Sequence, residues 1–230
     1  MSRSTKAWRS LLSREFLLGG WSPDFWRANF TLLLSGTTVV TCIIQSNIGW
    51  EKVLKAVGFV PAAALSPSSW LSWLPGQSLP VALTWITYVF PHVGWGHIAG
   101  NVVGLLIFGG VVESRIGRRK YAAVVLFSVI LGVFALAVVH PRGTEPIGGG
   151  SLLLCTVLGI WSAMYLEANW RIHPAATLRI EMAAVAALSF WLMVRTAPSA
   201  PSLFLAVMWH IIPLMAGWFW YRIAGAAPRG

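Results

Sequence analysis

The stretch Gly148-Gly149-Gly150-Ser151-Leu152-Leu153-Leu154-Cys155-Thr156-Val157-Leu158-Gly159 joins a polar turn to an apolar run. Three consecutive glycines permit backbone conformations and close approaches that other residues resist. Ser151 then stands where a helix is expected to begin, among unpaired backbone N–H groups that favour negative charge. The serine is either an N-cap, the common role of serine before a helix, or a nucleophile whose oxyanion meets its own backbone N–H. Taken alone, this stretch favours the cap.

The composition is that of a membrane protein. Hydrophobic residues make up 57% of the 230 residues and charged residues only 10%, whereas ordinary soluble domains carry about 25% charged residues. The formal net charge is +10, but the basic residues form short clusters between apolar runs. Such clusters are typical of topology signals, so we expect no nucleic-acid partner. The 14 tryptophans, many of them near the ends of apolar runs, fit the two interfaces of a lipid bilayer.

Six apolar runs account for most of the chain. They cover about residues 30–48, 95–112, 121–139, 151–166, 175–193 and 202–221. The fourth run is short for a hydrocarbon core of about 30 Å, which indicates a helix that begins below the membrane surface. The first run is interrupted only by Ser, Thr and Gln45. The sequence therefore predicts an all-α membrane protein, with six transmembrane helices in one domain over residues 29–224.

The segments outside these runs have distinct characters. Residues 1–28 are basic with interleaved aromatic residues, so we expect a cytoplasmic tail that lies partly on the lipid headgroups. Residues 49–82 are too polar to span, and Trp70-Leu71-x-Trp73-Leu74 within them predicts a loop segment that lies in the membrane interface. Residues 225–230 are expected to form a short C-terminal tail.

The basic residues also predict the orientation. Of the 17 Lys and Arg residues, all but four would lie on one side of a six-span protein. The four exceptions are Lys52, Lys55, Arg142 and Arg195. By the positive-inside rule both termini are then cytoplasmic, and Ser151 opens from the other side. This orientation predicts a multi-pass protein of a bacterial inner (plasma) membrane.

Polar side chains inside apolar runs are costly, so each is a candidate functional residue. His97 and Asn101 are four residues apart and share one helix face, His92 stands just before them, and His210 lies in the last run. Each has a plainer interpretation. The His97–Asn101 pair is typical of hydrogen bonding between helices, and His210 fits a buried structural histidine.

A metal site is the weaker hypothesis for these histidines. Two or three histidines could bind a metal, but no carboxylate joins them. Cys42 and Cys155 both lie inside apolar runs and lack the spacing of metal ligands. We expect neither a metal nor a cofactor.

The joint pattern is more specific than any of its parts. His92-x-x-x-x-His97-x-x-x-Asn101 is followed by Gly149-Gly150-Ser151 and then by His210 with Gly217 seven residues later. This order resembles the rhomboid family of intramembrane serine proteases. Thr87-Tyr-Val-Phe90-Pro-His92 and Phe108-Gly109-Gly110-Val-Val-Glu113-x-Arg115-x-Gly117 also resemble the segments before and at the end of the family's second span. The resemblance covers about residues 58–222 and implies a rhomboid-like helical bundle.

The resemblance implies a Ser–His dyad. His210 would take the proton from Ser151 Oγ and return it to the leaving amine. His97, Asn101 and the Ser151 N–H would form the oxyanion hole. The resemblance also implies that the oxyanion hole is supported by His92, Gly149 and Gly150. The implied activity is that of a serine endopeptidase that cleaves single-span membrane proteins near the non-cytoplasmic membrane surface without a metal or cofactor.

Three positions depart from the family pattern. Leu152 replaces the glycine that follows the serine, Cys155 replaces an aromatic residue one turn later, and Pro213 replaces a glycine three residues after the histidine. We expect leucine to crowd the helix start and proline to bend the last helix. These departures are the best support for an alternative, a catalytically inactive rhomboid-like protein that binds or routes membrane clients, whereas the intact Ser151 and His210 argue against it. A small transporter or channel is disfavoured, because buried charge pairs and internal repeats are missing from the sequence.

Overall fold

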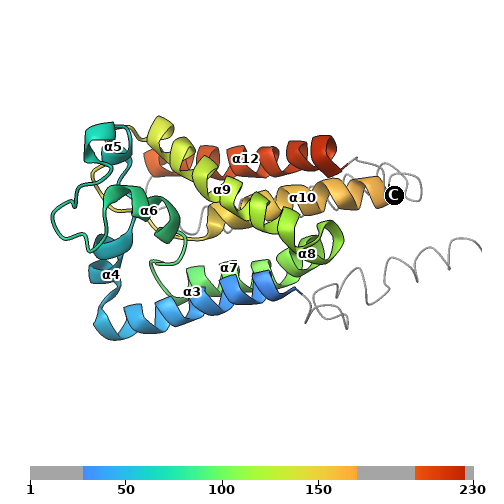
Figure 1. The fold of residues 1–230 in the computed structure, drawn as a ribbon, viewed down its shortest axis with the longest axis horizontal. Coiled ribbons are helices and arrows are strands. Elements are labelled where there is room, and N and C mark those ends of the chain that lie inside the picture. Colours follow the sequence, from blue (N-terminus) through green and yellow to red (C-terminus); the bar gives the residue numbers. More distant parts are fainter. Residues whose placement is uncertain (1–27, 170–199, 226–230) are drawn as a thin grey trace, which may run out of the picture.

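The computed structural model describes residues 28–169 and 200–225, and the described part is a bundle of helices (Figure 1). In chain order its elements are α3 (Asn29–Ile48), α4 (Trp50–Val57), α5 (Pro61–Ala64), η3 (Pro67–Ser69), α6 (Val81–Thr87), α7 (Trp95–Gly104), η4 (Leu105–Gly109), α8 (Gly110–Ile116), α9 (Arg118–Val139), α10 (Ser151–Asn169), α12 (Ala200–Trp220) and η5 (Tyr221–Gly225). The predicted all-α class is confirmed for this part of the chain. The fifth predicted span and nearly all of both predicted tails lie outside the described residues.

Three helical segments of the described part are long and apolar enough to cross a membrane. They are Asn29–Ile48, Trp95–Ile116 and Arg118–Val139, and they begin and end within a few residues of the first three predicted runs. The second segment joins α7 to α8 through the π-helical turn η4. Helix α10 is apolar over the shorter stretch Ser151–Glu167, in line with the short fourth run. A total of six spans stays a prediction.

The buried residues of helix α3 are mostly polar, and its exposed face carries large apolar side chains. Its buried residues are Thr31, Ser35, Thr38, Cys42 and Gln45. The opposite face exposes large apolar side chains, among them Leu33, Val40, Ile43, Ile44 and Ile48. In water this distribution would be unfavourable, whereas lipid tails are themselves apolar and leave polar groups to be satisfied inside the protein. The distribution of side chains on α3 therefore fits a helix whose exposed face contacts lipid.

Helix α10 packs closely against α7 and α9 through glycines of those helices. A Cβ atom added at Gly104 of α7 would lie 2.7 Å from Leu154 Cδ2, and one added at Gly132 of α9 would lie 2.9 Å from Leu152 Cδ1. Small residues let membrane helices approach closely. The two glycines thus make room for two of the leucines that open α10.

Helices α10 and α12 run in the same direction and touch backbone to backbone (Figure 1). Gly159 of α10 lies against the backbone of Leu214, and Gly217 of α12 lies against the backbone of Thr156. Neither glycine has room for a Cβ atom unless a helix moves. The two glycines therefore set both the spacing of α12 from α10 and its alignment along α10.

Glu113 of α8 ties the second span to the first. Its carboxylate is buried and accepts hydrogen bonds from the backbone N–H groups of Phe30 at 3.1 Å and Thr31 at 2.8 Å. These N–H groups belong to the first turn of α3 and have no partner within the helix, so the carboxylate caps α3. Arg118 Nε lies 3.8 Å from the same carboxylate.

The loop segment over residues 49–82 gathers at the end of the bundle where α10 begins (Figure 1). Phe59 forms an isolated antiparallel bridge with Ile147, through hydrogen bonds of 2.9 and 2.7 Å. This bridge joins the loop segment to the turn before the glycines. Leu71 and Trp73 are 83% and 62% exposed, which suits the predicted place in the membrane interface. That location itself stays a prediction.

Candidate active site

The centre of the site is a contact between Ser151 and His210. Ser151 Oγ lies 2.9 Å from His210 Nε2, although the two residues are 59 positions apart in the chain. Ser151 is the first residue of α10, and His210 lies halfway along α12. The distance is within the range at which a base can take the proton of a serine hydroxyl. The structure thus brings together the two residues that the resemblance proposes as a dyad.

Gly149 needs to be glycine for two reasons. Its φ is +134°, a conformation that residues with a side chain rarely adopt, and a Cβ atom there would lie 2.9 Å from His97 Cε1. The Gly149 N–H donates to the carbonyl of Tyr88 at 2.8 Å. The turn before Ser151 is therefore held in place by backbone hydrogen bonding and lies directly against the His97 ring.

The hydrogen bonds of His92 define which of its ring nitrogens carries the proton. Nδ1 lies 2.8 Å from the carbonyl of Phe90, which can only accept, so Nδ1 donates. Nε2 is then an acceptor, and it lies 2.8 Å from Asn101 Nδ2 and 3.4 Å from the Gly150 nitrogen. The ring is buried, and this burial lowers the pKa of His92, against a smaller opposite effect of the Phe90 carbonyl. A neutral ring therefore holds the Asn101 amide and the Gly150 N–H together.

His97 and Asn101 retain hydrogen-bonding capacity beside the turn that precedes Ser151. The His97 ring packs edge-on against His92 with ring centroids 4.9 Å apart. Its Nδ1 is buried and makes no hydrogen bond to any residue that the structure describes. His92 takes one of the two hydrogens on Asn101 Nδ2, which leaves the second to donate elsewhere. The free N–H of Asn101, and His97 Nδ1 when it carries the ring proton, can donate to an acceptor that a ligand supplies.

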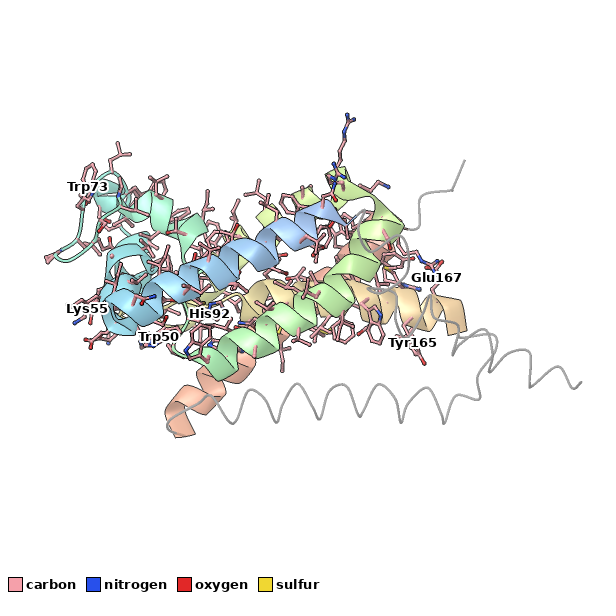
Figure 2. All side chains as sticks on the ribbon, turned by 90° about the horizontal axis from the view of Figure 1, so that it is seen from below. Trp50, Lys55, Trp73, His92, Tyr165 and Glu167 are labelled. Atoms are coloured by element: carbon pink, nitrogen blue, oxygen red, sulfur yellow. The ribbon has the colours of Figure 1, made fainter. Side chains whose placement is uncertain are left out.

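Gln45 belongs to the surroundings of the site, although the sequence pattern does not single it out. It is fully buried at the end of α3. Its Oε1 accepts from the His92 N–H at 2.9 Å, and its Nε2 donates to the His92 carbonyl at 3.0 Å. The sequence signal was a lone glutamine in an apolar run, and nothing near it in the chain points to His92. Figure 2 shows His92 between the helices, toward the same end as Trp50.

The three departures from the family pattern leave the contact between Ser151 and His210 in place. The Leu152 side chain lies over Gly132 of α9, in a cluster of buried residues that includes Val129 and Val133. Helix α12 continues through Pro213, which is buried. Cys155 is a buried free thiol. Ser151 Oγ and His210 Nε2 still lie 2.9 Å apart.

Two comparisons with known proteins bear on this site. Residues 81–226 match the family model of the Rhomboid domain. The chain is also similar to the Rhomboid protease GlpG of Enterobacter sp. (strain 638), with 25% identity over 130 residues. That similarity covers 56% of this chain and 41% of the relative, so it spans less than half of the relative's length. Because the family model covers well over half of the chain, this integral membrane protein belongs to the rhomboid family.

Proposed function

We propose that this protein is an intramembrane serine protease with Ser151 and His210 as its catalytic dyad. The observation that carries the proposal is the 2.9 Å contact between Ser151 Oγ and His210 Nε2 in a chain of the rhomboid family. A serine hydroxyl is a weak nucleophile until an adjacent base can accept its proton. A histidine within hydrogen-bond reach provides that base.

The reaction proceeds in two halves. His210 takes the proton of Ser151 as Oγ bonds to the carbonyl carbon of the scissile peptide, and the carbonyl oxygen becomes negative. When the carbon–nitrogen bond breaks, His210 gives this proton to the leaving amine and an ester on Ser151 remains. Water then attacks the ester with His210 as base, and the proton returns to Oγ as the acid product leaves.

The oxyanion is stabilised by donors around the turn. The Ser151 N–H lies in the first turn of α10, where backbone N–H groups have no helical partner. The second Nδ2 hydrogen of Asn101 and the ring of His97 complete the set. His92, Gly149 and Gly150 support it through the contacts described above. In comparable sites one such donor is worth about 3–4 kcal/mol in the transition state.

The substrates we propose are single-span membrane proteins that are cut near the non-cytoplasmic surface. Figure 2 places Trp50, Lys55, Trp73 and His92 toward one end of the bundle and Glu167 at the other. With six spans and both termini in the cytoplasm, the first of these ends faces outward from a bacterial inner membrane. Peptide bonds inside a transmembrane helix are hydrogen-bonded, so small, helix-weakening residues near that surface are the expected substrate feature.

Cleavage in liposomes tests the proposal. The purified protein is reconstituted with a single-span reporter that carries Gly, Ala and Ser at one membrane boundary, and the products are identified by mass. We expect cleavage by the parent and by His140→Ala, which removes an exposed histidine of a polar turn. Ser151→Ala and His210→Ala are expected to be inactive. Reporter bound but left intact by the parent, over a panel of boundary sequences, would support the alternative of an inactive client-binding protein.

A further inference from the structure

Gln45 is the point at which helix α3 reaches the site. Its side-chain amide lies alongside the backbone of His92, with Oε1 2.9 Å from the His92 nitrogen and Nε2 3.0 Å from the His92 oxygen. An amide is both a donor and an acceptor, so one side chain satisfies both backbone groups of a residue in a loop. Its Nε2 also lies 3.4 Å from the carbonyl of Trp50. Cys42 of the same helix also lies near His92, with its Sγ 3.9 Å from Nδ1.

His92, whose backbone Gln45 holds, contacts both the Asn101 amide and the turn before Ser151. His92 Nε2 lies 2.8 Å from Asn101 Nδ2 and 3.4 Å from the Gly150 nitrogen. Gly150 is bonded directly to Ser151, so a shift of His92 changes the positions of both the Asn101 amide and the turn before the serine. Residues 91–93 lie outside any helix and make no hydrogen bond to another backbone group in the described part of the chain. Their backbone therefore depends on contacts from elsewhere.

We propose that Gln45 is a positioning residue, which holds the backbone of His92 so that the His92 ring keeps Asn101 and Gly150 aligned for the oxyanion. This inference rests on the proposed protease activity. Gln45 touches neither the substrate nor the reacting atoms. It acts through His92, and its loss lowers the turnover rate while leaving substrate binding unchanged.

Gln45→Met tests this role, because methionine keeps the length of the side chain and removes both hydrogen bonds. Thr38→Val is the matched control. Thr38 is buried on the same face of α3, but its hydroxyl donates to Leu34 of its own helix at 2.9 Å. For cleavage of the single-span reporter we expect Gln45→Met to lower kcat about 10- to 100-fold with KM within about twofold, since small misplacements of catalytic groups cost this much. Thr38→Val is expected to keep the parent's kcat.

A double-mutant cycle separates positioning from a general loss of stability. If Gln45 acts through Asn101, Gln45→Met has little further effect on kcat once Asn101→Ala is present. If the two losses in kcat multiply, Gln45 does not work through this path and the inference is wrong. A fall in kcat for Thr38→Val equal to that for Gln45→Met would likewise overturn it.

The tautomer of His92 provides a measurement that does not require cleavage. In protein labelled with ¹⁵N-histidine, we expect His92 of the parent and of Thr38→Val to carry its proton on Nδ1. Gln45→Met is expected to show a mixture of the two tautomers. An unchanged His92 spectrum in Gln45→Met would contradict the inference. If the parent fails to cleave any reporter, the proposed function fails, and the spectrum alone decides whether Gln45 holds His92.

Discussion

The side chain of Leu152 packs over Gly132, where an added Cβ atom would lie 2.9 Å from Leu152 Cδ1 and closer still to the Tyr88 hydroxyl. Leu152 is the residue directly after the proposed nucleophile, in a place where the family pattern has glycine. Its side chain is buried among residues of α9, including Val129 and Val133. The departure from the family pattern is thus matched by a glycine on the facing helix.

Replacing Leu152 by the glycine of the family pattern is therefore expected to lower the free energy of unfolding. Leu152→Gly removes a buried side chain, at a cost of about 2–5 kcal/mol for a large-to-small change in a core, and adds about 1 kcal/mol for glycine in a helix. The free energy of unfolding in detergent measures the loss. Stability equal to the parent's, together with higher activity, would show that Leu152 impairs the site.

Gly149→Ala is expected to lower activity by about 100-fold or more, because a misplaced catalytic turn has effects of this size. The new methyl group would meet His97 Cε1 at 2.9 Å and would force a side chain onto a φ of +134°. Cleavage of the reporter measures the effect. Gly100→Ala is the control, since a Cβ atom there meets nothing within 4 Å. Equal activity of the two variants would mean that the turn tolerates a side chain.

Gly159→Ala is expected to separate α12 from α10 and to draw His210 away from Ser151. The added Cβ atom meets the backbone of Leu214, which cannot move without the helix. We expect a lower free energy of unfolding and a slower reaction of Ser151 with a fluorophosphonate, a reagent that labels activated serines. Gly36→Ala, which places a methyl group in open space on α3, controls for the change of residue type. Normal labelling of Gly159→Ala would show that the helix spacing does not set the contact.

Glu113→Gln is expected to destabilise the fold without directly changing the chemistry. The carboxylate accepts from the N–H groups of Phe30 and Thr31, and hydrogen bonds to a charged group contribute about 1.5–3 kcal/mol. A neutral amide retains one acceptor oxygen, so part of this stabilisation is lost. Unfolding measurements report the loss, and the kcat of the folded enzyme is expected to stay near that of the parent. A large fall in kcat at full stability would assign Glu113 a different role.

The sequence predicted those parts of the fold that depend on local composition. Apolar runs give the limits of α3, α9 and the second span, because the length and hydropathy needed to cross a bilayer are properties of a single segment. The bridge between Phe59 and Ile147 was beyond such a prediction, since it joins two loops 88 residues apart that have no strand pattern.

The candidate site was predictable through the family resemblance and much less through pattern alone. His97, Asn101, Ser151 and His210 look like ordinary buried polar residues until their order along the chain is considered. Gln45 was missed, because its role comes from the backbone of a residue 47 positions away. The packing of Leu152 over Gly132 was likewise beyond the sequence, because it depends on a residue of another helix.

The most direct test of the proposed dyad is the reaction of the purified protein with a fluorophosphonate, which labels an activated serine and requires no substrate. The probe is applied to the parent, to Ser151→Ala and to His210→Ala, all shown to be folded, and the labelled residue is identified by mass spectrometry. We predict labelling of the parent at Ser151 and none in either variant. A folded parent that stays unlabelled, or a His210→Ala variant labelled as fast as the parent, would contradict the proposed dyad.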